Sequence, residues 1–293
     1  NRDEVFQRAE MVVKVASIAQ SEIQLLQDNQ ILLSFSHLGA GKKQVIESLL
    51  EKKITSIGYE LIEKNNTLPI LHSMGEIAGQ LSMQVAEWLL ESSSPQHRGI
   101  LMGGIPGVAP AAVVILGAGV VGTTAAKAAL GRGAQVIMVD KDLNRLRYCE
   151  TLFGKRITTV VANPYTISRG VKFADVFIGA VMTKGEKTPH LVTEEMVKTM
   201  KRGAVIIDVS IDQGGCVETS RPTSLSNPIF VQHGVIHYCV PNVPSNVARS
   251  ATYALNNVMV PFLMGIGDAG GVEKALWTNH ALRNGIYVYR RHL

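Results

Sequence analysis

The stretch from Ala112 to Asp140, AVVILGAGVVGTTAAKAALGRGAQVIMVD, restricts the fold of this chain more than any other part of the sequence. A β-branched run at residues 113–116 is typical of a buried parallel strand, and the pattern G-x-G-x-x-G follows it directly. A helix of small residues is expected at about 120–130, and a second apolar strand at 135–139 leads into Asp140. The order of strand, glycine turn, helix, strand and acid predicts a dinucleotide-binding unit.

Each conspicuous residue of this stretch has a physical role. Gly117 permits the tight turn, Gly119 lets a pyrophosphate approach the backbone, and Gly122 lets the helix lie close to the strand. The N-terminus of the helix presents free N–H groups and a positive dipole end to the phosphates. Asp140 can bind both ribose hydroxyls of the adenosine and would repel a 2′-phosphate, so NAD is predicted rather than NADP.

Two other interpretations of the same stretch compete with this one. A glycine-rich turn can also occur in a parallel sheet that binds no ligand, but the full context of strand, helix and acid favours a nucleotide site. Residues 108–126 carry no charge, yet Pro110 and the glycines argue against a membrane span.

Composition sets the remaining limits. The 293 residues suffice for two domains, and 46% hydrophobic with only 5% aromatic residues fits an α/β protein. The net charge is +5, but the basic residues are dispersed, so no nucleic-acid partner is expected. Cys149, Cys216 and Cys239 lack the spacing of metal ligands and are expected to be reduced, mostly buried thiols of a cytoplasmic protein. The chain begins at Asn1 within a predicted helix, so the natural protein is expected to extend further at this end.

Strands and helices are expected to alternate on both sides of the nucleotide motif. Strands are predicted at 11–15, 31–36 and 54–59 in the first part, and at 157–161, 176–181, 204–209 and 235–240 in the second. Long helices at 74–90 and 246–264 would connect the two parts. The predicted fold is therefore α/β, with two Rossmann-like doubly wound domains joined by long helices. Residues 1–73 and 246–293 form the expected substrate domain, and residues 74–245 the NAD-binding domain.

The carboxyl ends of parallel strands face the ligand crevice of such a sheet. Asp140, Val181, Asp212 and Asn242 lie at or just after predicted strand ends, and His37 has the same place in the first domain. A cleft between the domains is expected, with NAD on the side of the second one.

Two of these residues can carry proton chemistry. His37 can act as a general acid and base near neutral pH, or it can be a loop histidine bonded to a carbonyl group. Asp212 can balance a substrate ammonium group or orient water, or it can cap a turn. His72, His190, His233 and His237 show no paired spacing and are expected to be structural or exposed. Lys14 lies within an apolar strand, where it either reaches solvent or points at the cleft.

Taken together, the motifs resemble alanine dehydrogenase. The resemblance covers nearly all of the chain and rests on SHLG around His37, MGEIAG, LMGGIPGV, LGAGVVG, IGAV, LVTEEMVKTMK, IDQGG, ETSRPT, YCVPNVP and ATYALNN. The related transhydrogenase α subunit shares the fold, but ETSRPT and the short loops around the site are more similar to alanine dehydrogenase.

The resemblance implies reversible NAD-dependent oxidative deamination of L-alanine to pyruvate and ammonia by a hexamer. It implies that His37 is the catalytic acid and base, and that Asp212 is the second catalytic residue. The glycines of the motif together with the family's cofactor contacts give the expected NAD-binding set: Gly117, Gly119, Val120, Val121, Gly122, Asp140, Arg145, Val181, Met182, Val209, Ser210, Ile211, Arg221, Val240, Asn242 and Val243. No metal ligand and no membrane partner are expected.

The chain departs from the family pattern at three positions that matter for ligands. Ala16 occupies the place of the family's substrate lysine, and Gly75 and Ala162 replace two serines on the cofactor side. The family's substrate arginine lies near an N-terminal segment that this sequence does not include. A dehydrogenase of another small amino acid, or an NAD-binding relative with weak activity, therefore stays open as an alternative.

Overall fold

The computed structural model describes residues 1–36, 38, 43–93, 96–183 and 187–292. Its contacts divide the chain into two compact units. Within the described residues, the first unit holds residues 1–74 and 252–292, and the second holds residues 75–183 and 187–251. The chain passes from one unit to the other within α4 (Pro69–Leu90) and again within α9 (Ala248–Asp268).

The first unit is built on a 4-stranded sheet in the order β1-β2-β3-β11. The strands β1 (Met11–Val13), β2 (Ile31–Ser34) and β3 (Thr55–Gly58) are parallel, and β11 (Ile286–Val288) joins β3 in the antiparallel direction. The shorter elements of this unit are α1 (Arg2–Arg8), α2 (Gln20–Ile23), α3 (Lys43–Glu51), η2 (Tyr59–Leu61), α10 (Val272–Thr278) and α11 (His280–Asn284).

The second unit is built on a 7-stranded sheet in the order β6-β5-β4-β7-β8-β10-β9. It contains β4 (Ala112–Leu116), β5 (Gln135–Asp140), β6 (Ile157–Val161), β7 (Val176–Gly179), β8 (Val205–Asp208), β9 (Ile229–Gln232) and β10 (Val235–Tyr238). All neighbours are parallel except β9, which forms a hairpin with β10. The chain runs outward from β4 to β6 and then returns to β7 on the other side of β4, and ligands bind doubly wound sheets at such a reversal.

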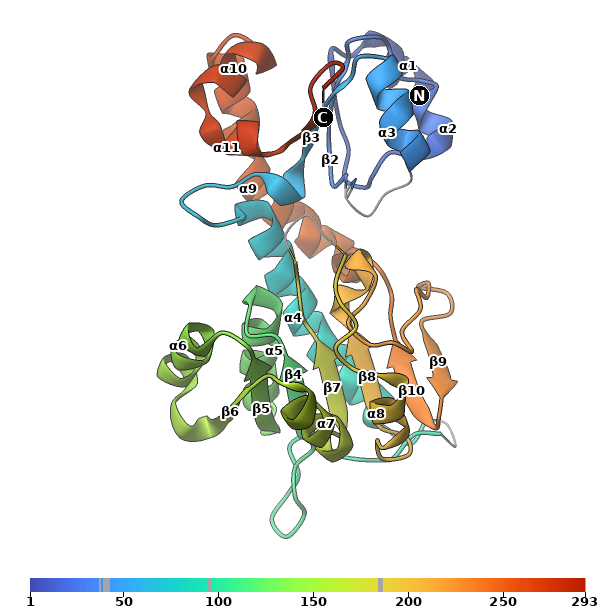
Figure 1. Ribbon diagram of the computed structural model, residues 1–293, viewed down its shortest axis with the longest axis vertical. Coiled ribbons are helices and arrows are strands. Elements are labelled where there is room, and N and C mark those ends of the chain that lie inside the picture. Colours follow the sequence, from blue (N-terminus) through green and yellow to red (C-terminus); the bar gives the residue numbers. More distant parts are fainter. Residues whose placement is uncertain (37, 39–42, 94–95, 184–186, 293) are drawn as a thin grey trace. The chain divides into compact units, whose positions relative to one another are not determined.

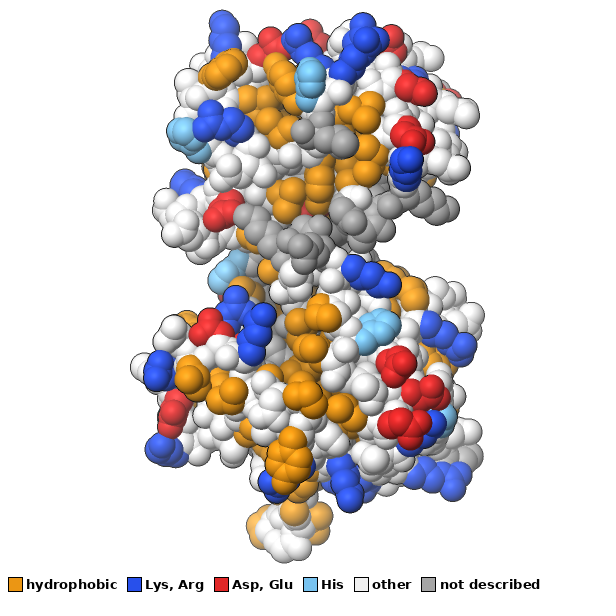
Figure 2. Space-filling view, viewed as in Figure 1, with side chains coloured by type: hydrophobic (Ala, Val, Ile, Leu, Met, Phe, Trp, Pro, Cys, Tyr) orange, Lys and Arg blue, Asp and Glu red, His pale blue; other side chains and the backbone are white. Residues whose placement is uncertain are grey.

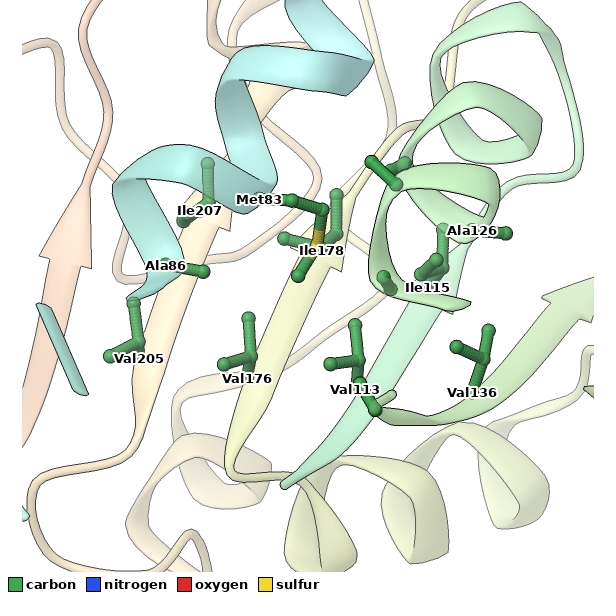
Figure 3. Packing of buried hydrophobic residues seen from close by; sticks show 14 of the residues in the cluster. Met83, Ala86, Val113, Ile115, Ala126, Val136, Val176, Ile178, Val205 and Ile207 are labelled. Atoms are coloured by element: carbon green, nitrogen blue, oxygen red, sulfur yellow. The ribbon is translucent and has the colours of Figure 1, made fainter. Parts of the chain in front are cut away.

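Helices cover both faces of this sheet (Figure 1). One face packs against α4, α5 (Val120–Gly131) and α6 (Leu143–Phe153), and the other against α7 (Pro164–Phe173) and α8 (Glu194–Lys198). Figure 3 shows Met83 and Ala86 of α4 and Ala126 of α5 over the buried strand side chains. Because both faces are covered, the central strand β4 is buried and apolar at every position, which explains the continuous run at 113–116.

The predicted fold class is confirmed: the chain is α/β, with two units and mostly parallel strands. The relation between the two units, and with it the expected cleft, stays a prediction.

Positive and negative side chains are interspersed over the face drawn in Figure 2. Across the described part of the chain, no helix combines the length and the apolar character needed to cross a membrane.

Candidate dinucleotide site

The turn between β4 and α5 has the geometry that its glycines require. Gly117 has a φ of +109°, which is a left-handed conformation that side chains disfavour, and a β-carbon there would overlap the backbone oxygen of Ala180. A β-carbon on Gly122 would overlap the carbonyl oxygen of Gly117. The turn therefore packs against the end of β7, at the point where the strand order reverses.

Gly119 differs from these two glycines because the space beside it is open. It caps α5 without a side-chain hydrogen bond, and the atom nearest to a β-carbon at this position would be Nη1 of Arg145, 4.0 Å away. The N–H groups of Val120 and Val121 lie in the first turn of α5, so they have no acceptor within the helix. Open space, backbone donors and a guanidinium group fit the phosphates of a dinucleotide.

Asp140 ends β5 beside this turn. Its side chain is 7% exposed, and Oδ2 accepts the N–H of Ala118 at 2.6 Å while Oδ1 accepts that of Asp142 at 2.8 Å. A carboxylate has about four acceptor positions, so each oxygen keeps one for a ribose hydroxyl. The backbone bonds fix the carboxylate at the edge of the sheet where the sequence places the adenosine.

Two hydrogen bonds connect the loops after β7, β8 and β10. Val181 donates its N–H to Oγ of Ser210 at 3.0 Å, and Asn242 donates its N–H to Oδ1 of Asp212 at 2.8 Å. Asp212 and Asn242 are exposed, and Asn242 has a left-handed φ of +51°. The side chain of Asp212 therefore lies at the carboxyl edge of the sheet and joins two loops there.

The strand that carries Asp212 ends earlier than the sequence suggests. A strand was expected at 204–209, but β8 ends at Asp208, and Val209–Gln213 forms the short 3-10 helix η4. Asp212 is thus held on a helical turn rather than directly at the strand end.

The other expected contact residues fall into two groups. The side chains of Ile211, Val240 and Val243 are nearly fully buried in the protein, so only their backbone groups are available to a ligand. Met182 is half exposed, and Val209 is partly exposed. Gly75 lies against the first turn of α5, where a β-carbon would be 3.3 Å from Cγ1 of Val120.

Arg221 lies at the other margin of the sheet. Its guanidinium group is 4.3 Å from the ring centroid of Phe230 in β9, and that ring also stacks on the imidazole of His237 at 4.7 Å. The described contacts therefore do not bring Arg221 together with Asp140 and Arg145.

His237 is completely buried and structural, as expected. One ring nitrogen lies 2.8 Å from Oγ1 of Thr219 and the other lies 3.0 Å from the carbonyl oxygen of Val235. Burial lowers the pKa of His237 to about 4, so the ring is neutral in the folded protein at neutral pH.

This burial predicts a pH dependence of stability. Between pH 6.5 and 4 the unfolded chain binds a proton at His237 that the folded protein does not, so the free energy of unfolding should fall by up to roughly 3 kcal/mol as the pH is lowered through this window. In chemical denaturation at several pH values, His237→Gln should remove this part of the slope, while His190→Gln at an exposed position should keep it. An unchanged slope in His237→Gln would show that the histidine does not titrate as inferred.

Lys14 and Ala16, two positions considered for the substrate side, lie in the first unit. His37 falls outside the residues that the structure describes. Lys14 donates to Oε2 of Glu22 and to the carbonyl oxygen of Ser17, so its ammonium group is engaged within its own unit. Ala16 is exposed, and its methyl side chain carries no group that could bind a carboxylate.

Asp208 was missed by the sequence reasoning. It ends β8 as Asp140 ends β5, and it is 1% exposed. The sequence did contain a signal for Asp208, because both acids come directly after a run of buried apolar residues. Cys149, Cys216 and Cys239 are free, buried thiols, as expected.

Two family models together match almost the whole chain. "Alanine dehydrogenase/PNT, N-terminal domain" matches residues 1–78, and "Alanine dehydrogenase/PNT, C-terminal domain" matches residues 82–293. The chain belongs to the alanine dehydrogenase/PNT family. The resemblance seen in the motifs is thereby confirmed.

Curated members of the alanine dehydrogenase/PNT family are similar over nearly the full chain. The alanine dehydrogenase of Methanococcus maripaludis is 46% identical over 97% of this chain and 76% of its own length. That of Bacillus subtilis is 44% identical over 97% and 75%, and alanine dehydrogenase 2 of Staphylococcus aureus is 41% identical over 97% and 76%. These relatives are oxidoreductases by name.

Solved structures agree with this assignment. An L-alanine dehydrogenase matches with a TM-score of 0.90 and 44% identity, covering 99% of this chain and 80% of the other. A transhydrogenase from Sinorhizobium meliloti, at 20% identity and a TM-score of 0.77 over 99% and 80%, shares the fold.

Proposed function

We propose that this protein is an NAD-dependent alanine dehydrogenase. It converts L-alanine, NAD and water reversibly to pyruvate, ammonium, NADH and a proton. The observation that carries the proposal is the 41–46% identity to proteins named alanine dehydrogenase over 97% of the chain. The nucleotide-binding turn and Asp140 independently support an enzyme that uses a dinucleotide.

The second unit supplies the nucleotide site in this proposal, and the first unit supplies the substrate side. The N–H groups of Val120 and Val121 and the guanidinium of Arg145 bind the pyrophosphate, and Asp140 binds the adenosine ribose. The loops at 181–182, 209–211 and 240–243 hold the nicotinamide end, and Arg221 adds a cationic contact there. The nicotinamide supplies the hydride chemistry, so the protein contributes orientation and charge.

Two residues act on the substrate. His37 takes a proton from the water that adds to the imine carbon and passes it to the departing amine nitrogen, and it acts in the reverse sense when the imine forms. Asp212 stabilises the cationic amine or imine through its negative charge and positions the attacking water. The Asn242 N–H bond at 2.8 Å keeps the Asp212 carboxylate in one orientation for this role.

Turnover with a panel of keto acids tests the proposal. NADH oxidation by the full-length protein should be fastest with pyruvate and ammonium, compared with glyoxylate and 2-oxobutyrate. Turnover restricted to another keto acid would keep the reaction and change the substrate. If NADH binds but no keto acid is reduced, the protein is a nucleotide-binding relative and the enzyme proposal fails.

Nucleotide preference is a separate prediction. A like-charge contact costs several kcal/mol, so Asp140 should favour NAD over NADP by at least about 100-fold in kcat/KM. Asp140→Asn keeps an acceptor for the N–H of Ala118 but loses the charge, and it should narrow the preference by about tenfold or more. Glu150→Gln, an exposed acid of α6, is the matched control. A wild-type preference in Asp140→Asn would remove Asp140 from the ribose site.

The proposal extends to the setting of the enzyme. We place it in the cytoplasm as a homo-oligomer, and as a hexamer by analogy with the family. Its partners are a small amino acid or keto acid and NAD, without a nucleic acid or a membrane component.

A further inference from the structure

The buried carboxylate of Asp208 accepts hydrogen bonds from several backbone N–H groups of the segment that follows β8. Oδ1 accepts the N–H of Ser210 at 3.1 Å, and Oδ2 accepts the N–H groups of Cys216 at 2.9 Å and Val217 at 3.2 Å. The Cys216 thiol also lies 3.6 Å from Oδ1. One side chain therefore joins both ends of residues 209–217 and closes them into a loop.

This loop carries the residues that meet the neighbouring strands. Oγ of Ser210 accepts the N–H of Val181 beyond β7, and Oδ1 of Asp212 accepts the N–H of Asn242 beyond β10. Gly214 and Gly215 have φ values of +98° and +84°, which permit the turn that returns the chain to Asp208. The position of Asp212 thus depends on a loop whose two ends share one anchor.

Asp208 itself has no access to a ligand. It is 1% exposed, and a β-carbon on Gly215 would lie 2.8 Å from Oδ2, while one on Gly179 would lie 3.0 Å from Oδ1. The two glycines and the Cys216 thiol lie against the carboxylate, and at 1% exposure it is not open to substrate. Any influence on the reaction must therefore pass through the residues that it holds.

We propose that Asp208 is a positioning residue, which fixes the loop of residues 209–217 and thereby sets the carboxylate of Asp212 against the N–H of Asn242. The inference rests on the proposed function, because it assigns Asp208 a role only through the catalytic Asp212. An uncharged side chain of the same shape accepts fewer of these N–H groups. In Asp208→Asn, the amide nitrogen is a donor and must face at least one of the N–H donors.

The environment of Asp208 acts on its charge in two opposite ways. Burial is the largest influence and raises the pKa of Asp208, while the Ser220 hydroxyl and the N–H groups of Val217 and Cys216 act in the opposite direction. A buried carboxylate with several donors is costly to leave unpaired, so it holds its donors firmly.

A double-mutant cycle on the full-length enzyme tests this proposal. Wild type, Asp208→Asn, Asp212→Asn and the double variant are compared by kcat for alanine oxidation. Displacing a reacting group by about 1 Å can cost on the order of 100-fold, so Asp208→Asn should lower kcat by about this factor in the wild-type background. In the Asp212→Asn background, it should lower kcat less than about threefold, because residues that act as a unit are not additive.

The pH profile gives a second readout that loss of stability alone would not change. When the loop shifts in Asp208→Asn, the carboxylate of Asp212 loses the N–H of Asn242 and is protonated more readily. The acidic limb of the kcat/KM profile should therefore move to higher pH in this variant. Val171→Ala is the matched control, because it truncates a fully buried side chain of α7 outside the loop of residues 209–217. It should lower the melting temperature and leave kcat and the acidic limb unchanged.

The outcomes distinguish a failure of the catalytic role of Asp212 from a failure of the positioning role of Asp208. Wild-type turnover in Asp212→Asn alone would defeat the catalytic role of Asp212. Suppose that Asp212→Asn does lose turnover. The positioning role of Asp208 is then wrong if Asp208→Asn lowers kcat equally in both backgrounds, or if it leaves the acidic limb of the pH profile unmoved. If Asp208→Asn does not fold, Gly179→Ala places a β-carbon 3.0 Å from Oδ1 without a positive φ and carries the same two expectations.

Discussion

Asp212→Asn is expected to lower kcat for L-alanine by about 100-fold to 10,000-fold, the range that a positioned proton-transfer or charge-stabilising group contributes. The asparagine keeps an oxygen that can accept the N–H of Asn242, so the loop should retain its conformation. What disappears is the negative charge beside the cationic amine or imine. The dissociation constant of NADH, measured by fluorescence titration, should change less than about threefold, because binding and turnover are separate free energies.

The control for Asp212→Asn is an acid away from the carboxyl edge of the sheet. Glu195 in α8 is 82% exposed and pairs with Lys198, so Glu195→Gln should have wild-type turnover. If Asp212→Asn also retains wild-type turnover, Asp212 only joins the loops, as a turn-capping aspartate would.

Gly122→Ala should have the largest effect on the nucleotide site. The new β-carbon would overlap the carbonyl oxygen of Gly117, and no side-chain rotation relieves a clash with backbone. α5 must shift away from the turn, which should lower the free energy of unfolding by about 1–3 kcal/mol. The displaced N–H groups should weaken NADH binding at least about tenfold, which corresponds to about 1.4 kcal/mol.

Gly131 provides a matched substitution in the same helix. It is the last residue of α5, and nothing lies within 4 Å of a β-carbon there. Gly131→Ala should therefore be neutral or should stabilise the helix by up to about 1 kcal/mol, with unchanged NADH affinity. Equal behaviour of the two alanine variants in calorimetry and titration would contradict the close approach assigned to Gly122.

Most of the second unit could be predicted from the sequence because its elements have local signals. β4, α5 and β5 follow from the apolar runs and the glycine pattern, and their observed bounds differ from the expected ones by one residue at most. α4 begins at Pro69 rather than at the expected residue 74. Proline is favoured in the first turn of a helix, so this start had a local signal that was overlooked.

Two strands were missed, and of these only β11 depends on a distant partner. β9 pairs with β10 across a turn in which His233 and Gly234 both have positive φ, and β11 pairs with β3, which lies far away in the sequence. The three residues of β11 have no period that distinguishes a strand from a loop. β11 returns the C-terminal region to the first sheet.

The candidate site was predictable where it depends on strand ends. Asp140, Val181, Asp212 and Asn242 lie at the carboxyl edge of one sheet, as parallel topology requires. The hydrogen bonds among their loops were not predictable, because they depend on side chains from separate strands. The role of Asp208 was hidden for the same reason, since its partners at 216 and 217 become neighbours only after the loop has closed.

Isotope transfer tests directly whether the protein transfers hydride from L-alanine to NAD. The full-length protein is incubated with NAD and L-alanine that carries deuterium at Cα, and the products are analysed by mass spectrometry and NMR. Pyruvate and NADH should form in equal amounts, with the deuterium at C4 of the nicotinamide. NAD binding without labelled NADH, under conditions in which the protein is folded, would contradict an alanine dehydrogenase activity.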